Sequence, residues 1–175
     1  KNYMLYSTEY QSPLGALTLA CREDGAALAG LWMEAQKYFG CAEALVRNDA
    51  LPLFAEAEDW LDRYFAGEKP EVSALPLAPE GGPFRQRVWA LLRAVPYGET
   101  VTYGQLAARI DPAGGGRGAA RAVGGAVGHN PRSVIIPCHR VVGADGSLTG
   151  YAGGLERKLL LLRLEGVDIA RPGAR

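Results

Sequence analysis

The hydrophobic pattern of this 175-residue chain changes from strand-like to helix-like across residues 66–83, a stretch rich in Gly, Pro and Glu. Before it, two apolar runs at residues 15–20 and 26–33 are separated by a loop that ends in Asp24-Gly25, a hairpin signal. A helix is predicted from Pro52 to Phe65, with apolar residues at helical spacing and Gly67 at its end. We therefore interpret residues 66–83 as an inter-domain linker. It separates an N-terminal domain, residues 1–80, from a C-terminal domain, residues 81–175.

The second half of the chain is predicted to be mostly helical. One helix spans residues 84–92 and ends before the turn Pro96-Tyr97-Gly98. Thr102 and Gln105 have the spacing of a capping box, which starts a second helix that runs to Ile110. Residues 111–116 contain Asp, Pro and three consecutive glycines, and they interrupt the helix before a third helix at about residues 118–127. Two short helices joined by a Gly-rich turn indicate a helix-turn-helix.

The third of these helices is built almost entirely from Ala, Gly and Val, and only Arg121 carries a charge. Such a smooth helix can approach another surface closely, because it has almost no side chains to keep the two apart. A tightly packed core helix would have the same composition, so both interpretations stay open at this stage.

The net charge of zero conceals a division between the two halves. Residues 1–80 contain 6 Lys or Arg and 13 Asp or Glu, a balance of −7, whereas residues 81–175 contain 13 and 6, a balance of +7. A basic C-terminal half favours binding to nucleic acid, because neutralisation of phosphates supplies most non-specific affinity for DNA. The alternative is that the two oppositely charged halves attract each other.

The sequence Pro137-Cys138-His139 places a thiol beside an imidazole. It follows the apolar run at residues 133–136, which Pro137 ends because proline has a fixed φ and no N–H. We therefore expect Cys138 at the rim of the core. A cysteine near a base is a simple activated nucleophile. The alternative interpretation is a small buried cysteine with an incidental histidine.

Several further motifs accompany this pair in a fixed order. They are Ala119–Ala126, Asn130-Pro131, Pro137–Val141, Gly150–Leu155 and Glu165-Gly166. From about Phe84 to Gly166 the chain resembles the O6-alkylguanine-DNA alkyltransferases, and the first 80 residues resemble their N-terminal domain loosely. The resemblance implies a small N-terminal α/β domain with an antiparallel sheet, followed by a mostly helical C-terminal domain with a helix-turn-helix. It also implies repair of double-stranded DNA by irreversible transfer of an alkyl group from O6-alkylguanine to a cysteine of the protein itself. Activity on O4-alkylthymine is left open.

By this resemblance Cys138 is the acceptor and His139 the base, which acts through a water. Glu165 orients the imidazole as the third member of a triad, and Asn130 braces the active-site loop. Tyr103 helps to rotate the phosphate and donates its proton to the departing guanine.

The resemblance also implies that the damaged nucleotide is flipped out of the duplex into the protein. Arg121 fills the vacated space in the minor groove, where Ala119, Ala120 and Gly124 of the same helix make the close approach. The flipped base lies in a pocket made by Pro137, Val141 and the lid residues Tyr151, Ala152 and Gly153. The Ala152 N–H matches the donor to guanine O6.

Other predictions rest on what the sequence lacks. Three cysteines form an odd number without a CxxC pair, which argues against a disulfide framework and for a reducing cytoplasm. Cys21 is interpreted as a core residue, and Cys41 has no motif around it. With only two histidines we expect no structural zinc site. We expect no cofactor, because thiolate displacement at an alkyl carbon needs none. We also expect no membrane span and a monomer.

Three other functions are each opposed by a feature of the sequence. The alkyltransferase-like proteins bind alkylated DNA without repairing it, but they lack the acceptor that Cys138 provides here. A cysteine hydrolase usually takes its base from a distant segment, and the only other histidine is His129. A helix-turn-helix regulator needs a recognition helix that reads more bases than this small, nearly uncharged helix can.

Overall fold

A computed structural model describes residues 4–36, 44–78 and 81–169. These residues form two compact units. The first contains the described residues up to Ala78 together with Pro131–Ser133. The second contains the described residues from Gly81 to Asn130 and from Val134 onward. Cys41 lies outside the described residues.

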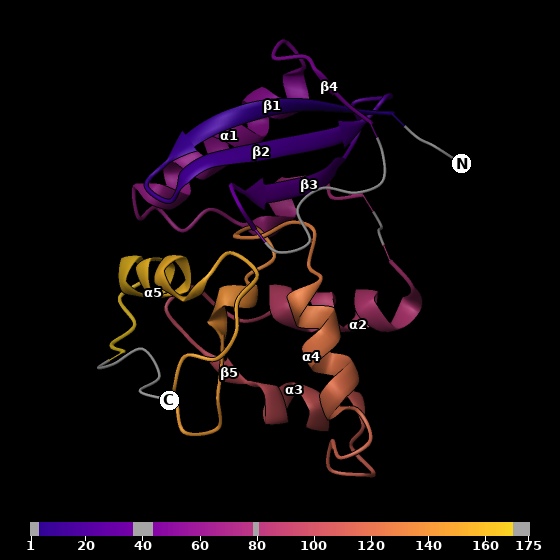
Figure 1. Cartoon of the computed structure of the whole chain (residues 1–175), viewed down its shortest axis with the longest axis vertical. Coiled ribbons are helices and arrows are strands. Elements are labelled where there is room, and N and C mark those ends of the chain that lie inside the picture. Colours follow the sequence, from indigo (N-terminus) through magenta and orange to yellow (C-terminus); the bar gives the residue numbers. More distant parts are fainter. Residues whose placement is uncertain (1–3, 37–43, 79–80, 170–175) are drawn as a thin grey trace. The chain divides into compact units, whose positions relative to one another are not determined.

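A four-stranded sheet forms the first unit, in the order β3-β2-β1-β4 (Figure 1). β2 (Gly15–Arg22) and β3 (Leu28–Met33) are the two predicted strands, and the Asp-Gly loop joins them as an antiparallel hairpin. Gly25 has a φ of +64°, and its N–H donates to the Arg22 carbonyl at 2.9 Å. β1 (Met4–Ser12) pairs antiparallel with β2, whereas β4 (Ala44–Arg47) pairs parallel with β1. The sequence did not predict β1 and β4. Both mix polar and apolar residues, and β4 is exposed along its whole length.

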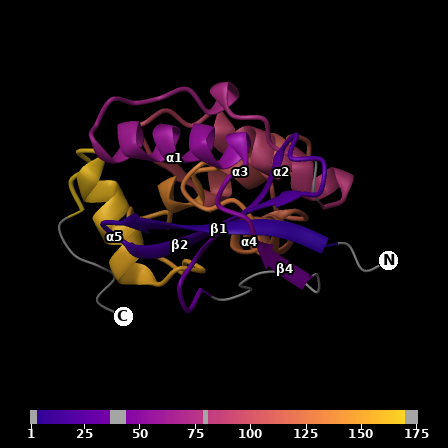
Figure 2. The same ribbon diagram turned by 90° about the horizontal axis from the view of Figure 1, so that it is seen from above.

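Helix α1 (Pro52–Phe65) covers one face of this sheet (Figures 1 and 2). Pro52 starts the helix, as expected, and the predicted apolar stripe points toward the sheet. The phenol of Tyr10 on β1 donates to Asp62 on α1 at 2.6 Å, and its ring stacks on Phe65. Cys21 is buried in this core, which confirms the interpretation made from the sequence. The buried residues of α1 are Leu53, Phe54, Ala57, Trp60, Leu61 and Tyr64.

The interpretation of residues 66–83 as a linker was wrong for residues 72–78. A short 3₁₀ helix, η1 (Val72–Ala74), follows α1, and Leu75 and Ala78 beyond it are buried. The chain there pairs with β3: Leu28 N–H donates to the Pro76 carbonyl at 2.8 Å, and Ala78 N–H donates to the Leu28 carbonyl at 3.0 Å. The apolar residues within this Pro-rich stretch thus extend the core of the first unit. Residues 79–80 lie outside the described residues.

Residues 131–133 also pair with β3, although they lie far along the chain. Leu31 N–H donates to the Pro131 carbonyl at 2.8 Å, and Ser133 N–H donates to the Leu31 carbonyl at 3.2 Å. Arg132 is buried, and its guanidinium donates to the Ala78 carbonyl. These three residues directly precede the run that leads to Cys138.

The second unit is mostly helical, and its helices fall close to the predicted ranges. α2 (Pro83–Arg93) and α3 (Tyr103–Ile110) match, and Thr102 caps α3 in the predicted capping box with Gln105. α4 (Ala120–Gly128) is joined to α2 through Trp89, whose indole N–H donates to the Ala126 carbonyl at 2.8 Å. The remaining elements are β5 (Val101–Thr102), the 3₁₀ helix η2 (Cys138–Arg140), β6 (Val141–Val142), which pairs parallel with β5, and α5 (Leu155–Leu164).

Helix α4 has two different faces, and this decides between the two interpretations of its small residues. Val123, Ala126 and Val127 are buried against the unit. On the other side, a Cβ atom added to Gly124 or Gly125 would meet no atom within 4 Å. The glycines of α4 therefore do not serve tight internal packing; they leave a smooth surface open.

Among the described residues no helix is both long and apolar enough to cross a membrane.

Candidate active site

Cys138 begins the 3₁₀ turn η2, and Pro137 is its N-terminal cap. Cys138 N–H donates to the Ile136 carbonyl at 2.8 Å, and Arg140 N–H donates to the Pro137 carbonyl at 3.0 Å. These tight bonds fold the chain back inward after the buried residues 134–136, so Cys138 is only 4% exposed. The expected position at the rim of the core was therefore wrong.

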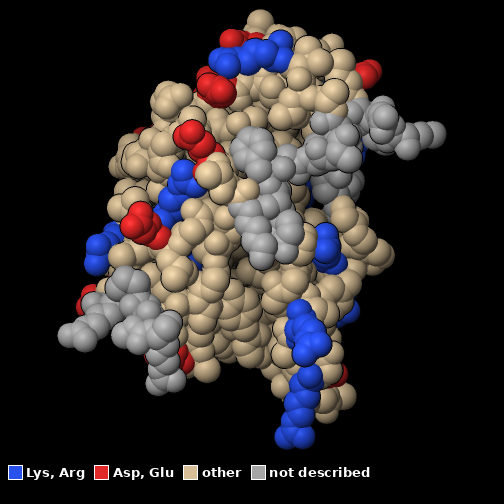
Figure 3. Space-filling view, in the orientation of Figure 1, with Lys and Arg blue, Asp and Glu red and all other residues tan. Residues whose placement is uncertain are grey.

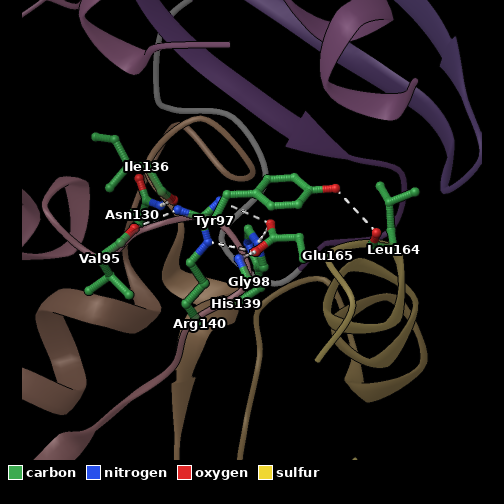
Figure 4. Close-up of polar contacts among 9 residues, drawn as sticks. All are labelled: Val95, Tyr97, Gly98, Asn130, Ile136, His139, Arg140, Leu164 and Glu165. Atoms are coloured by element: carbon green, nitrogen blue, oxygen red, sulfur yellow. Dashed lines mark hydrogen bonds and ion pairs between the residues drawn. The ribbon is translucent and has the colours of Figure 1, made fainter. Parts of the chain in front are cut away.

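His139 and Glu165 form a buried pair (Figure 4). The imidazole Nε2 lies 2.6 Å from a Glu165 carboxylate oxygen, and neither side chain is exposed. Burial lowers the pKa of His139, and the Glu165 carboxylate opposes this effect. Within the described part of the chain, the buried Nδ1 of His139 has no hydrogen-bond partner. The ring can therefore offer Nδ1 to a proton carrier while Glu165 holds the other nitrogen.

Glu165 is the centre of a wider polar cluster (Figure 4). The guanidinium of Arg140 donates to both carboxylate oxygens, at 2.8 and 3.0 Å, and to the Val95 carbonyl at 2.7 Å. Gly98 N–H, in the turn after α2, donates to Glu165 at 3.2 Å. Burial alone would raise the pKa of Glu165, but hydrogen bonds from His139 and Arg140 outweigh it and hold that pKa well below its usual range. Glu165 thus stays a carboxylate at neutral pH, and Arg140 holds it in position.

Asn130 follows α4 and braces the segment before the cysteine. Its amide donates to the Ile136 carbonyl at 2.7 Å, and the residue is buried. Burial raises the pKa of the Cys138 thiol, and hydrogen bonding from the Asn130 and Tyr151 side chains works in the opposite direction. The structure therefore brings Cys138, His139, Glu165, Asn130 and Tyr151 into one site.

Sequence reasoning missed Lys158, which is fully buried on α5. Its ammonium donates to the Thr149 carbonyl at 3.1 Å and to the Gly150 carbonyl at 3.4 Å. Burial lowers its pKa to about 8, and its charge favours the thiolate of Cys138. One signal could have revealed it: Lys158 is three and four residues before Leu161 and Leu162, which form the buried side of α5.

Tyr103, the first residue of α3, faces the same segment as Lys158. Its hydroxyl lies 3.5 Å from the Gly150 carbonyl, at the limit of a hydrogen bond, and burial raises its pKa. Of the other predicted pocket residues, Pro137 and Val141 are buried, whereas Ala152 and Gly153 are partly exposed in the segment that precedes α5. The predicted pocket residues are thus divided between buried positions and a partly exposed segment before α5.

Arg121 stands apart from this cluster. It is exposed on α4, as is Ala120, while Ala119 is buried and Gly124 is half-buried. No ion pair of Arg121 occurs within the described ranges, so its guanidinium is available to an external partner. The described residues contain no group of three or more His, Cys, Asp or Glu side chains that could hold a metal ion.

Comparison with known proteins places both units in one protein family. Residues 4–79 match the family described as 6-O-methylguanine DNA methyltransferase, ribonuclease-like domain, and residues 83–167 match its DNA binding domain. The methylated-DNA–protein-cysteine methyltransferase of Haemophilus influenzae is 45% identical over 169 residues, which are 97% of this chain and 90% of that protein. The enzyme of that name from Methanosarcina acetivorans is 44% identical, over 93% and 99% of the two chains.

Solved structures agree with the sequence comparison. The crystal structure of OGT from Mycobacterium tuberculosis in complex with DNA superimposes with a TM-score of 0.81 at 44% identity, over 92% of this chain and 93% of that one. The O6-methylguanine-DNA methyltransferase of Pyrococcus kodakaraensis gives a TM-score of 0.65 at 26% identity, over 94% and 100% of the two chains. With a buried cysteine beside a His–Glu pair and these relatives on both units, this chain belongs to the 6-O-methylguanine DNA methyltransferase family.

Proposed function

We propose that the Cys138 sulfur accepts the alkyl group in the reaction of this protein, the direct repair of O6-alkylguanine in DNA. The Cys138 thiolate attacks the alkyl carbon, an S–C bond forms, and the O6–C bond breaks. The guanine leaves with the electron pair of that bond, and a proton donated by Tyr103 to N3 neutralises it. The product is an S-alkyl thioether that the protein cannot easily reverse, so each molecule reacts once.

The observation that carries this proposal is the buried His139–Glu165 pair, one residue along the chain from Cys138. When the thiol loses its proton, by way of a water to His139, the imidazolium forms 2.6 Å from a carboxylate that is already charged. Attraction between opposite charges is stronger in a buried site than in water. Glu165 therefore favours the state in which Cys138 is a thiolate.

The residues around Gly150 support a pocket for the extruded base. The Tyr103 hydroxyl is only weakly held at 3.5 Å, so it can turn from the Gly150 carbonyl to a guanine ring nitrogen at little cost. Lys158 donates to the same carbonyl and keeps it satisfied when Tyr103 leaves. The Ala152 N–H and Gly153 lie in the lid segment that would cover O6.

The surface of α4 supports the approach to DNA through a helix-turn-helix formed by α3 and α4. An exposed arginine beside glycines with open space around them suits the minor groove, which is only about 6 Å wide. Arg121 would enter the stack in place of the flipped nucleotide. Its planar cation can stack on bases and donate hydrogen bonds at the same time.

The same chemistry favours a cytoplasmic monomer. Cys21 and Cys138 are free cysteines in the described structure, and a reducing compartment protects a nucleophilic thiol from oxidation. One molecule contains all of the proposed residues. We assign the N-terminal unit, residues 1–80, a structural role and the C-terminal unit, residues 81–175, DNA binding and transfer.

Mass spectrometry after incubation with duplex DNA containing O6-methylguanine tests the proposal. We expect a stable gain of one methyl group on the peptide that contains Cys138, and a Cys138→Ser variant should gain none. Tight binding of the same duplex without any gain in mass would overturn the acceptor assignment and favour a lesion-binding protein of the alkyltransferase-like type.

A further inference from the structure

The loop between α3 and α4, residues 111–119, presents a second basic feature besides Arg121. Arg109 lies in the last turn of α3 and Arg117 lies in the loop, and both are exposed. Neither forms an ion pair with any residue that the structure describes. In Figure 3 blue side chains run down the part of the surface where Figure 1 draws α4 and this loop, with little red beside them. Two positive charges without a protein partner, close to the helix proposed to bind DNA, suit a negatively charged ligand.

The loop is held in a defined shape. Asp111 accepts from Gly114 N–H through its side chain at 3.2 Å and from Gly116 N–H through its carbonyl at 3.0 Å. Arg117 N–H donates to the Gly114 carbonyl at 3.4 Å, and Ala119 N–H donates to the Gly116 carbonyl at 3.1 Å. A loop with these internal bonds loses little conformational entropy when it binds a partner.

Gly116 seats this loop directly on α3. It is buried with a φ of +88°, and a Cβ atom there would lie 2.8 Å from the Ala107 carbonyl carbon and the Ala108 amide nitrogen. Arg117 follows Gly116, and Arg109 follows Ala108. The contact between the two backbones therefore brings the two arginines to the same end of α3.

The position of this pair relative to Arg121 determines what it can meet. Arg117 lies in the loop three residues before α4 begins at Ala120, and Arg121 lies in the first turn of that helix. Four residues of chain span at most about 14 Å, so the two arginines belong to the same part of the surface. The minor groove is about 6 Å wide and is bordered on each side by a phosphate chain. If Arg121 enters the base stack from the groove, the long side chains of the loop that leads into α4 lie close enough to reach the border of the groove. Guanidinium groups bind phosphate oxygens there with two parallel hydrogen bonds.

We propose that Arg109 and Arg117 bind the sugar-phosphate backbone of the DNA strand beside the lesion and so extend the contact beyond α4. The inference rests on the proposed function, because it takes Arg121 to lie in the minor groove. Arg109 and Arg117 then increase the affinity for DNA and take no part in alkyl transfer, since phosphate contacts position a protein on the duplex without reading bases. Lesion-containing and undamaged duplexes should depend on the pair to the same extent.

The test is a salt titration of duplex binding with Arg109→Gln, Arg117→Gln and the double variant, all with Cys138→Ser to prevent transfer. Each lost phosphate contact should reduce the slope of log affinity against log salt by about 0.9, and should weaken binding roughly eightfold at 0.1 M salt. We expect a reduction of about 1.8 for the double variant on both duplexes. On a short duplex that ends at the lesion on this side, the double variant and its parent should bind equally.

Two further variants separate charge from position. Gly116→Ala keeps every charge but forces the loop away from α3, so the slope should fall by about one contact. Arg63→Gln on α1 makes the same charge change in the acidic first unit and should leave the slope unchanged. With Cys138 restored, all of these variants should still react with free O6-benzylguanine at the wild-type rate, which shows that the site is intact.

The outcomes distinguish this inference from the proposed function. If wild-type protein methylates Cys138 but the double variant keeps the full salt slope, the phosphate pair is wrong and the repair reaction stands. A loss of affinity for the lesion duplex alone would also overturn the inference, because it would assign the arginines to lesion recognition. If wild-type protein does not methylate Cys138 at all, the proposed function fails, whatever the salt slope.

Discussion

The His139 imidazole and the Glu165 carboxylate lie 2.6 Å apart, and both side chains are completely buried. The same carboxylate also accepts from Arg140, so it lies between two groups that carry or can take a positive charge. Burial lowers the pKa of His139, and Glu165 is the group that counteracts this effect. How readily the imidazole takes a proton from Cys138 therefore depends on this one contact.

We predict that Glu165→Gln slows alkyl transfer and raises the apparent pKa of the Cys138 thiol, because a neutral amide stabilises an imidazolium less well. The pH dependence of thiol alkylation measures this. Glu156→Gln, an exposed carboxylate in the first turn of α5, is the matched control. Because Arg140 would lose its partner, the variant should also unfold more easily, by about 3 kcal/mol. An unchanged pH profile in a folded variant would remove Glu165 from the mechanism.

Cys138→Ala and Cys138→Ser should bind alkylated duplex DNA but transfer nothing. Binding depends on Arg121 and on phosphate contacts, whereas transfer needs the thiolate. Gel-shift measurements and mass spectrometry on the same samples report the two properties separately. Cys21→Ser is the control, since that thiol lies in the core of the first unit. Full transfer by Cys138→Ala would show that another residue is the acceptor.

Arg121→Ala should lose most repair of duplex O6-methylguanine and keep its reaction with free O6-benzylguanine. The free base needs no extrusion, so no gap has to be filled. For the duplex, a loss of about 2–3 kcal/mol of stabilisation corresponds to a rate lower by roughly 30- to 150-fold. The salt slope should change by about one contact or less, because Arg121 inserts between bases. If both substrates lose activity equally, Arg121 supports the fold of α4 instead.

Lys158→Met should slow the reaction with free O6-benzylguanine at neutral pH, because the ammonium favours the Cys138 thiolate and holds the Thr149–Gly150 carbonyls. Lys158→Gln also removes the charge but can keep one hydrogen bond. Because the pH profile of thiol alkylation depends on the charge, both variants should move it to higher pH by the same amount. Arg163→Met, exposed on the same helix, should behave like the wild type.

The buried Lys158 also predicts a pH dependence of stability. Its folded pKa of about 8 lies below its ordinary value, so between about pH 8 and 10.5 the unfolded state binds more protons than the folded state. Stability should therefore rise with pH across this window, by up to about 3 kcal/mol, relative to Lys158→Met. Urea unfolding of the two proteins at several pH values gives this difference. Parallel curves would show that burial does not lower the pKa of Lys158.

Much of this protein was determined by local sequence. Thr102 and Gln105 started α3, Pro52 started α1, and Asp24-Gly25 formed the hairpin, because caps, proline and turns act over a few neighbouring residues. The order of the motifs likewise identified the family. These features depend on residues that are close in the chain, so the sequence alone contains them.

Tertiary structure decided what depends on residues that are distant in the chain. The depth of Cys138, the parallel pairing of β4 and the packing of residues 72–78 beside β3 all contradict or extend the local pattern. The glycine face of α4 could be called open only when the packing of its other face was known. Lys158 is the clearest case. A lysine is normally expected at the surface, and here the carbonyls of Thr149 and Gly150 accept hydrogen bonds from its buried ammonium group. A buried charge is stabilised by particular partners in space, and no local pattern records those partners.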